Sequence, residues 1–304
     1  MPEKPRVSSI TAFYQKGTYL EKFLEYLPRQ TYFSRLEVVF DHNEPADSEV
    51  GLLNAFQENH PGALRYLVTD PVQPLGVSWN RCIRESCGEY LAIWNIDDLR
   101  TPGSIEMQAA YLDAHPQTGI VSGNFTYVDR FLSTTGTMVN FSTYPYDRLS
   151  AGYYFGPFIM FRRSLLDRAG LFDEQFRCAN DFDLAMRLLH HGRAHILPDN
   201  LGYFLDAGDG ASTKKDSLCP VEATAIKLRY GICEQVNYRH IPAALNYNLG
   251  NIRIGSEWIP VSRFVPGYEE MLEERLDWLS LKGLKETIKR RVFRSLRDLS
   301  RGRY

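Results

Sequence analysis

The 304-residue chain lacks the features that mark several large classes of protein. No uninterrupted apolar run approaches the roughly 20 residues of a membrane-spanning helix, so we do not expect an integral membrane protein. The formal net charge of −2 gives no overall attraction to nucleic acid, and no nucleic-acid partner is expected. Repeats of fixed period and low-complexity segments are also missing. The content of 44% hydrophobic and 24% charged residues instead indicates a soluble globular protein with a substantial core.

Cysteine is scarce and forms no pattern. The chain has five cysteines, an odd number without C-x-x-C spacing: Cys82, Cys87, Cys178, Cys219 and Cys233. We therefore expect neither a disulfide framework nor a zinc cluster, and a reducing compartment suits the composition best. The N-terminal segment MPEKPRVSS lacks the apolar core of a signal peptide. Together these features predict a cytoplasmic protein.

Two nucleotide-binding motifs are absent as well. No G-x-G-x-x-G follows the first apolar segment, and no G-x-x-x-x-G-K-[ST] occurs in the chain. Both motifs allow a glycine-rich backbone to approach phosphates closely. Their absence argues against a Rossmann dehydrogenase and a P-loop enzyme, but it leaves other nucleotide-binding α/β enzymes open, such as a nucleotidyltransferase.

What the first two thirds of the chain do contain is an alternation of short apolar segments with helical patterns. Strand-like runs occupy residues 7–13, 36–41, 63–70 and 89–95. Apolar residues at helical spacing follow each of them, over residues 18–30, 47–60, 77–87 and 102–115. This alternation is typical of right-handed βαβ units and a mostly parallel sheet, whose strands are covered on both faces. The sequence therefore predicts an α/β fold.

The pattern changes after about residue 215. Residues 221–236, 268–281 and 285–299 have helical patterns, and no strand-like segment lies between them. We therefore predict two parts, an α/β domain over residues 1–215 and a C-terminal helical appendage over residues 216–304.

Acidic residues follow two of the predicted strands. Asp41 ends the second strand, and Asp97 and Asp98 follow the fourth in the segment YLAIWNIDDLRTPGS. The carboxyl ends of parallel strands meet at one edge of the sheet, so these side chains should face the same crevice. Mg²⁺ or Mn²⁺ suits such a site, because either ion binds one or two carboxylates and completes its shell with substrate phosphates and water. The alternative is that Asp98 only caps the helix that begins near Pro102, with Asp97 solvated.

Five segments in series carry a family resemblance. They are VSSITAFYQKGTYLEKFLEYLPRQTY, LEVVFDHNEPADSE, GVSWNRCIRESCGEYLAIWNIDD, TPGSIEMQAAYLDAHPQTGIVSG and FGPFIMFRRSLLDRAGLFDEQFRCANDFDLAMRL. Their order and spacing resemble the family 2 glycosyltransferases of the GT-A fold, over about residues 5–215. The resemblance implies a Rossmann-like, mostly parallel sheet flanked by helices. It also implies an inverting hexosyltransferase-type enzyme that uses a nucleotide-diphosphate sugar and Mn²⁺ or Mg²⁺.

The resemblance assigns residues to the donor sugar-nucleotide and to the metal. Tyr14 would flank the base, Asp41 would bond the base or the ribose, and Asp98 would ligate the metal. The full nucleotide-sugar set is Phe13, Tyr14, Asp41, Asn80 and Asp97, and the metal set is Asp98 and Asp97. A packed core aromatic remains the alternative for Tyr14, and a solvated turn acid the alternative for Asp41.

Asp181 aligns with the catalytic base of the family. It lies in the first turn of a predicted helix, where the helix dipole favours an ionised carboxylate able to take a proton from the acceptor hydroxyl. The alternative is that Asn180 and Asp181 only cap this helix. Two positions depart from the family pattern, since Asn95 and Asn180 stand where acids are common. These departures leave open the alternative that the protein is a non-catalytic member of the family, which binds a nucleotide sugar or serves as a scaffold.

The C-terminal tail is strongly basic. From Lys282 to Tyr304 it carries nine Lys or Arg residues against only Glu286 and Asp298, with apolar residues near one helical face. Such a helix binds anionic membrane surfaces in some proteins and docks onto the rest of the chain in others. Both interpretations stay open. A glycan or lipid-linked glycan acceptor in surface polysaccharide synthesis would explain a peripheral membrane location.

Overall fold

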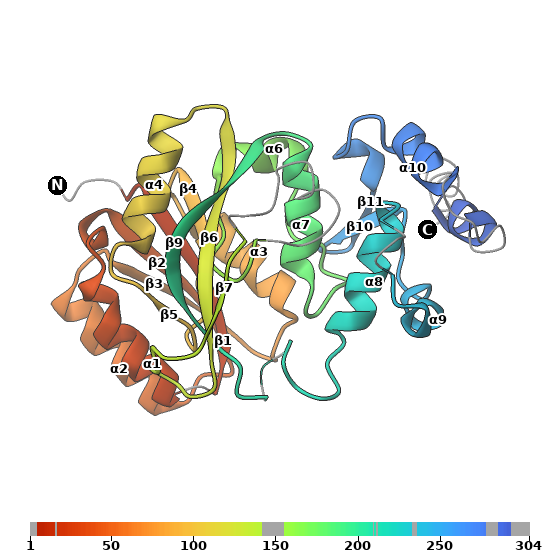
Figure 1. Ribbon diagram of the computed structural model, residues 1–304. Helices are drawn as coiled ribbons and strands as arrows, with labels where there is room; N and C mark the ends of the chain where they lie inside the picture. Colours follow the sequence, from red (N-terminus) through yellow and green to blue (C-terminus); the bar gives the residue numbers. More distant parts are fainter. Residues whose placement is uncertain are drawn as a thin grey trace.

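The structure is a computed structural model, and it describes residues 5–15, 17–141, 155–208, 210, 212–232, 236–277 and 285–292. Within these residues a nine-stranded sheet forms the centre, with the order β3-β2-β1-β4-β8-β6-β9-β5 and β7 paired to β6 (Figure 1). The strands are β1 (Val7–Tyr14), β2 (Leu36–Asn43), β3 (Leu64–Thr69), β4 (Tyr90–Ile93), β5 (Leu99–Arg100), β6 (Thr118–Val128), β7 (Thr137–Val139), β8 (Met160–Arg162) and β9 (Arg193–Leu205).

The first four strands pair in parallel, as the alternating pattern predicts. β1 pairs with β2 and β4, and β2 pairs with β3. β8 is antiparallel to both β4 and β6, whereas β6 and β9 are parallel again. The carboxyl ends of β1, β2 and β4 therefore meet at one edge of the sheet, which is where a ligand-binding crevice is expected in an open α/β sheet.

Helices cover both faces of the sheet. One face packs against α1 (Gly17–Tyr26), α2 (Asp47–Asn59) and α4 (Ser104–Ala114). The other packs against α3 (Leu75–Glu85), α6 (Leu166–Ala169) and α7 (Asn180–Leu189). Successive strand residues alternate between the two cores: Val38 and Phe40 of β2 lie in the first, and Val39 lies in the second. This double burial explains why the strand segments are mostly apolar and do not alternate regularly between apolar and polar residues.

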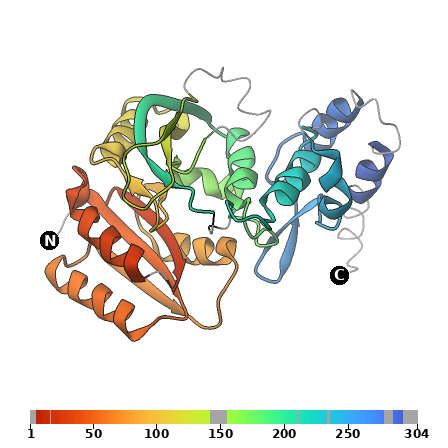
Figure 2. The same ribbon diagram turned by 60° about the horizontal axis from the view of Figure 1, so that its bottom comes forward.

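The C-terminal part packs on the outer side of α7. It consists of α8 (Cys219–Arg229), α9 (Ile241–Ala244), β10 (Asn251–Ile254), β11 (Glu257–Pro260), α10 (Tyr268–Asp277) and a helical segment over residues 285–292. Phe182 and Met186 of α7 share a core with these elements. Figure 2 shows this part beside α7, away from the first three strands.

The prediction of a C-terminal part without strands is wrong. β10 and β11 pair as an antiparallel hairpin through a turn at Gly255, whose φ is 62°. Four-residue strands with mixed polarity give too weak a period-2 signal to be recognised in sequence. The hairpin supports the segment ahead of α7, because Glu174 accepts a hydrogen bond from the backbone N–H of Gly255 at 2.7 Å. The domain boundary near residue 215 stays a prediction, since α7 packs on both parts.

A buried ionic network fastens α8 to α7. Arg229 lies 2.5 Å from Asp183 and 2.9 Å from Asp173, and all three side chains are fully buried. Removing Arg229 would leave the buried Asp173 without its ion-pair partner, which is strongly destabilising. The contact makes α8 a rigid neighbour of the helix that carries Asp181.

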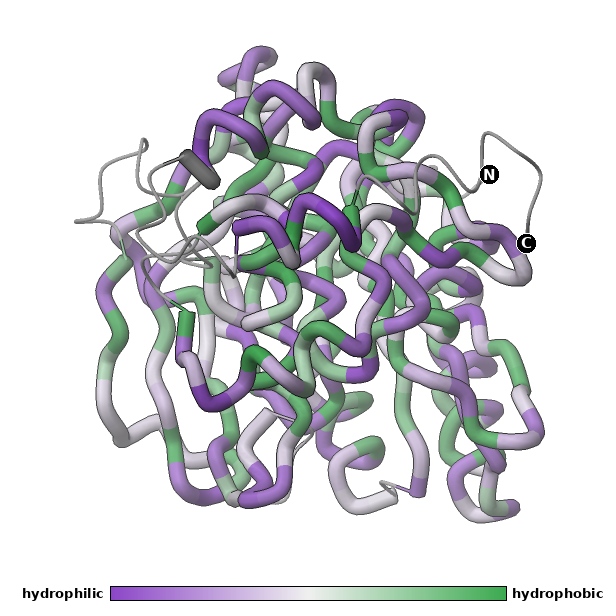
Figure 3. The backbone as a smooth tube through the Cα atoms, turned by 90° about the vertical axis from the view of Figure 1, so that its right-hand side faces the viewer, coloured by the Kyte–Doolittle hydropathy of each residue, from purple (hydrophilic) through white to green (hydrophobic). Residues whose placement is uncertain are grey.

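Hydrophobic segments are short throughout. Figure 3 shows hydrophobic stretches of backbone interrupted everywhere by hydrophilic ones. Within the part of the chain that the structure describes, no helix has both the length and the apolar character that crossing a membrane would need.

Candidate functional site

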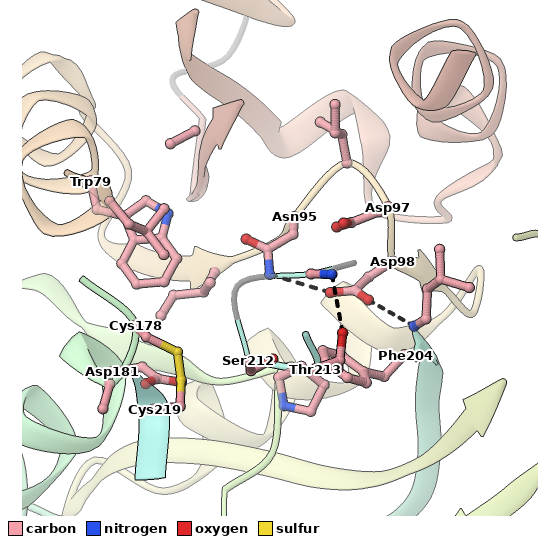
Figure 4. Close-up of a pocket in the computed structure, with 18 of the residues that line it drawn as sticks. Trp79, Asn95, Asp97, Asp98, Cys178, Asp181, Phe204, Ser212, Thr213 and Cys219 are labelled. Atoms are coloured by element: carbon pink, nitrogen blue, oxygen red, sulfur yellow. Dashed lines mark hydrogen bonds between the residues drawn. A yellow bond between two sulfur atoms is a disulfide. The ribbon is translucent and has the colours of Figure 1, made fainter. Parts of the chain in front are cut away.

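A large cavity of about 740 Å³ opens at the carboxyl ends of β1, β2 and β4. Among its described lining residues are Phe13 and Tyr14 from β1, Asn43 from β2, and the Asp97–Asp98 pair after β4. Asp181 on α7 lines the same cavity. In Figure 4 the acidic pair and Asp181 lie on opposite sides of the view. The fold therefore brings Phe13, Tyr14, Asp97, Asp98 and Asp181 together, as expected from the sequence.

Asp98 is held in place by hydrogen bonds from two directions. Its Oδ1 accepts from the backbone N–H of Leu205 at 3.2 Å, and its Oδ2 accepts from Nδ2 of Asn95 at 3.3 Å (Figure 4). Helix α4 begins at Ser104 after an N-cap at Gly103, and no side chain caps it. The alternative in which Asp98 caps this helix is therefore wrong. The amide at position 95, where acids are common, has a specific partner in this chain.

The acidic pair has the properties of a cation site. Asp98 is only 5% exposed, and burial followed by the charge of Asp97 raises its pKa well above the ordinary value. A bound divalent cation would offset both effects, because it favours the ionised carboxylate. Among the described residues, no cluster of three or more His, Cys, Asp or Glu could hold a metal ion. Two carboxylates fit Mg²⁺ or Mn²⁺, which complete their shells with phosphates and water.

A buried arginine supports the turn that carries the pair. Arg100 donates to the carbonyl of Ile93 at 2.9 Å and to Gln108 at 2.8 Å. Trp94 donates from Nε1 to the carbonyl of Asp98 at 3.0 Å. Burial lowers the pKa of Arg100 to about 9. These bonds fix both ends of the segment 93–100, so the two carboxylates point into the cavity from a rigid turn.

Asp181 lies in the first turn of α7, after an N-cap at Ala179. Its Oδ1 accepts from the backbone N–H of Phe182 at 2.8 Å. Asn180 is fully buried and donates from Nδ2 to the carbonyls of Asp173 at 2.9 Å and Phe176 at 2.8 Å. It therefore does not cap α7 but ties the helix start to the preceding loop.

Asn180 also explains a glycine in the motif GVSWN. A Cβ on Gly76 would collide with the Nδ2 of Asn180. Glycine at this position lets the start of α3 pack directly on the start of α7, on the floor of the cavity.

Two predicted donor residues do not line the cavity. Asp41 is fully buried, where its Oδ1 accepts from Thr69 at 2.7 Å and lies 3.1 Å from Arg81. It is not a solvated turn acid, and its Oδ2 has no hydrogen-bond partner. Asn80 is also fully buried and links α3 to the carbonyl and N–H of Phe172, both at 2.9 Å. The roles assigned to them in nucleotide binding stay predictions.

The exposure of Tyr14 decides between a cavity-lining ring and a packed core aromatic. Its ring is 41% exposed and lines the cavity, so it is not a packed core aromatic. Because β2 extends two residues past Asp41, Asn43 reaches the cavity in its place. The Oδ1 of Asn43 accepts from the backbone N–H of Gln73 at 2.8 Å, which fixes this part of the wall.

Several lining residues were missed in the sequence. The segment after β9 contributes Gly210, Ser212 and Thr213, and α8 contributes Cys219, Ala223 and Lys227. The last three are spaced by four residues and share one face of the helix. Lys227 is the only basic side chain among the described lining residues. The four-residue spacing in α8 is a detectable signal, but nothing in the sequence indicates what this helix faces.

A disulfide between Cys178 and Cys219 lines the cavity beside Asp181 (Figure 4). The Cα atoms are 5.3 Å apart, within the normal range. The cysteine pattern led us to expect no disulfide, and this pair corrects that expectation. Spacing could not reveal it, because the partners are 41 residues apart. In the chain-entropy account, closing a loop of this length with a disulfide raises the free energy of unfolding by about 4 kcal/mol. The cysteines therefore no longer support a reducing compartment, and Cys233 lies outside the described residues.

Comparisons with solved structures show the fold. The chain superposes on a mannosyltransferase, PcManGT of Pyrobaculum calidifontis in complex with GDP-Man and Mn²⁺, with a TM-score of 0.55 and 19% identity, over 94% of this chain and 73% of that one. The TarS 1-349 structure of S. aureus in complex with UDP-GlcNAc gives a TM-score of 0.62 at 17% identity, over 89% of this chain and 71% of that one. The α/β fold of GT-A type predicted from the sequence is confirmed.

Comparisons of sequence show the family. The chain is 24% identical to the putative glycosyltransferase EpsE of Bacillus subtilis strain 168 over 131 residues, which is 43% of this chain and 47% of that relative. The match thus spans about half the length of the relative. The model of the family described as glycosyl transferase family 2 matches residues 8–170. Because this match covers more than half of the chain, the protein belongs to glycosyl transferase family 2, as the resemblance of its motifs predicted.

Proposed function

We propose that the protein is an inverting glycosyltransferase, which moves a sugar from a nucleoside diphosphate sugar to a hydroxyl group of an acceptor. The observation that carries the proposal is the presence, in one cavity, of the acidic pair Asp97–Asp98, of which Asp98 is buried, and of a third carboxylate at a helix start on the other wall. The family match supports the reaction class. Two structural neighbours are complexes with nucleotide sugars, GDP-Man and UDP-GlcNAc.

The donor occupies the half of the cavity formed by β1, β2 and the acidic pair. Tyr14 offers an exposed ring to the base, and Asn43 offers a fixed polar wall. Asp98, with Asp97, would hold Mn²⁺ or Mg²⁺, which neutralises charge on the leaving nucleotide. The backbone N–H of Leu205 and the amide of Asn95 orient Asp98 for this role. Asp41 would bond the base or ribose through Oδ2, because Thr69 and Arg81 both engage its Oδ1.

The acceptor occupies the half formed by α7 and α8. Asp181 accepts the proton of the acceptor hydroxyl at a carboxylate oxygen as that hydroxyl attacks the anomeric carbon. A single displacement by this oxygen inverts the anomeric centre. Aromatic residues dominate the walls between the two halves: Trp79, Phe125, Tyr127, Phe141, Phe182 and Phe204. Such apolar walls suit the faces of sugar rings and exclude water from the reaction. A glycan or lipid-linked glycan acceptor is our proposal for the substrate class.

A screen of nucleotides tests the donor site. UDP, GDP, dTDP and CDP are each added with Mn²⁺, and the melting temperature is recorded with and without the metal. One nucleotide should stabilise the protein only when Mn²⁺ is present, by about 2.7 kcal/mol at one hundred times its dissociation constant. Nucleotide-sugar turnover then follows from release of that nucleoside diphosphate. If no nucleotide stabilises the protein, the proposal fails. Binding without turnover would favour the non-catalytic alternative.

The basic segment 285–292 is docked through its apolar side. Ile288 and Val292 are fully buried in the C-terminal core, and Lys289 lies 3.5 Å from Glu273. Arg290 and Arg291 stay exposed. These apolar residues are not available to enter a membrane, so we propose that contact with an anionic surface is electrostatic. The rest of the tail, residues 293–304, lies outside the described residues.

Charge removal tests this surface role without disturbing the core. Changing the exposed Arg290 and Arg291 to Gln should weaken sedimentation with phosphatidylserine vesicles, since each basic residue adds about 1 kcal/mol near an anionic surface. Binding of the unchanged protein should also weaken as salt rises. Changing the exposed Arg130 and Arg263 instead is the control and should have little effect. Equal vesicle binding by both double variants would remove the membrane role.

A further inference from the structure

The side chain of Glu222 on α8 binds the backbone just ahead of α7. Its Oε1 accepts from the N–H of Arg177 at 2.9 Å. Its Oε2 accepts from the N–H of Cys178 at 2.8 Å and of Ala179 at 3.0 Å. The hydroxyl of Tyr247 donates to Oε1 at 3.1 Å. Glu222 is fully buried, and these four donors match the four lone-pair positions of a carboxylate.

The segment that Glu222 binds leads directly to Asp181. Residues 177–179 end at the N-cap of α7, and Asp181 is in the first turn of that helix. Ala179 has no side chain that can cap the helix. The backbone N–H groups of residues 177–179 are therefore bonded by a side chain of α8. The direction in which the chain enters α7 is therefore set by the carboxylate of Glu222.

A second link joins the same two segments. The disulfide from Cys178 reaches Cys219, which lies three residues before Glu222 and so on a neighbouring part of the α8 surface. The Arg229–Asp183 ion pair holds the other end of α8 to α7. Burial, and next the charge of Glu222, raise the pKa of Tyr247 to about 12.

We infer that Glu222 is a positioning residue for Asp181, fixing the segment 177–179 so that the Asp181 carboxylate meets the acceptor hydroxyl. The inference rests on the proposed function, in which Asp181 is the base. Nothing in the family match assigns this role, because the match ends at residue 170 and Glu222 lies beyond it. A misplacement of about 1 Å at a reacting group costs as much as 10²-fold in rate. Glu222 thus makes the C-terminal part necessary for turnover.

Glu222→Gln is the decisive change, since it keeps the size of the side chain. Both oxygens of Glu222 accept from backbone N–H groups. In either orientation of the amide, its NH₂ group would face at least one of those N–H groups, so the segment must shift. We expect kcat to fall about 10²-fold while the nucleotide dissociation constant stays unchanged. The donor half of the cavity does not contact Glu222.

A double variant separates positioning from general loss of structure. If Glu222 acts through Asp181, the Asp181→Asn, Glu222→Gln enzyme should be no slower than Asp181→Asn alone. The control is Glu37→Gln, which changes another buried carboxylate that accepts a backbone N–H, from Cys87 at 2.7 Å, at the opposite end of the sheet. Its kcat should stay normal. If the fold-losses in kcat of the two single variants multiply in the double variant, the inference is overturned.

The readout is release of nucleoside diphosphate from the nucleotide sugar found in the screen, with calorimetry for nucleotide binding. If Glu222→Gln does not fold, Tyr247→Phe is the deciding variant. It removes one hydrogen bond to Glu222 and leaves the bonds from the backbone N–H groups in place. A lower kcat with unchanged nucleotide binding supports the inference, and an unchanged kcat overturns it. If Asp181→Asn itself keeps full turnover, the proposed function fails. If only Asp181→Asn is slow, the positioning role alone fails.

Discussion

Asp181→Asn should lower turnover by roughly 10²–10⁴-fold, the usual contribution of a positioned general base. Asparagine has the shape of aspartate and can still accept from the N–H of Phe182, so α7 should begin as before. It cannot accept the proton of the acceptor hydroxyl. The base acts mainly in the transition state, so the loss should appear in kcat and the nucleotide dissociation constant should barely change.

The matched control is Asp199→Asn, an exposed acid on β9 that does not line the cavity. It should turn over normally. Nuclear magnetic resonance of the product of the unchanged enzyme should show an anomeric configuration opposite to that of the donor, because one base in this position serves one displacement. A retained configuration, or near-normal turnover of Asp181→Asn, would overturn the mechanism.

The sheet and the acidic edge could be predicted because local signals and topology agree. β1, β2 and β4 are rich in apolar residues and buried at nearly every position, as two cores require, since Val38 and Val39 face opposite sides of the sheet. Parallel pairing then places the residues that follow these strands at one edge. Asp97 and Asp98 reached the cavity for this reason. Asp41 did not, because β2 continues for two more residues, so that Asn43, on the same side of the strand, stands at its end instead.

The parts that escaped prediction depend on contacts between distant residues. Cys178 pairs with Cys219 across 41 positions, and Glu222 binds residues 177–179 across a similar separation. Neither partner carries a local signal. Asn95 is a different case, because an amide at this position suggests that the acidic motif has lost one of its acids. Its amide donates to Asp98, so this position carries a hydrogen-bond donor to the Asp98 carboxylate instead of a third negative charge. The residue type alone does not show whether Asn95 weakens the acidic motif or supports Asp98 as a hydrogen-bond donor.

Asp98→Asn should abolish metal-dependent nucleotide binding and, in the absence of metal, make the protein more stable. The pKa of Asp98 is raised in the fold, first by burial and then by Asp97. A raised pKa means that the folded state binds the proton more tightly than the unfolded state, so ionisation at neutral pH costs stability, and this cost grows as pH rises. Asparagine removes that charge at nearly constant volume. It can still accept from the N–H of Leu205, and Asn95 can turn its amide to offer its oxygen.

The measurement combines melting in EDTA with calorimetry of Mn²⁺ and the nucleotide from the screen. The EDTA melting temperature should rise, and the nucleotide affinity measured with Mn²⁺ should fall to the metal-free value. Asp206→Asn is the control, because Asp206 is an exposed acid close in sequence to the end of β9 that does not line the cavity. It should leave both quantities unchanged. If Asp98→Asn binds Mn²⁺ and nucleotide like the unchanged protein, Asp98 is not the metal ligand. If instead only Asp206→Asn loses binding, the ligand lies in the segment after β9. A rise in stability together with a loss of binding would show that the buried charge is kept for the cation, since the fold alone is better without it.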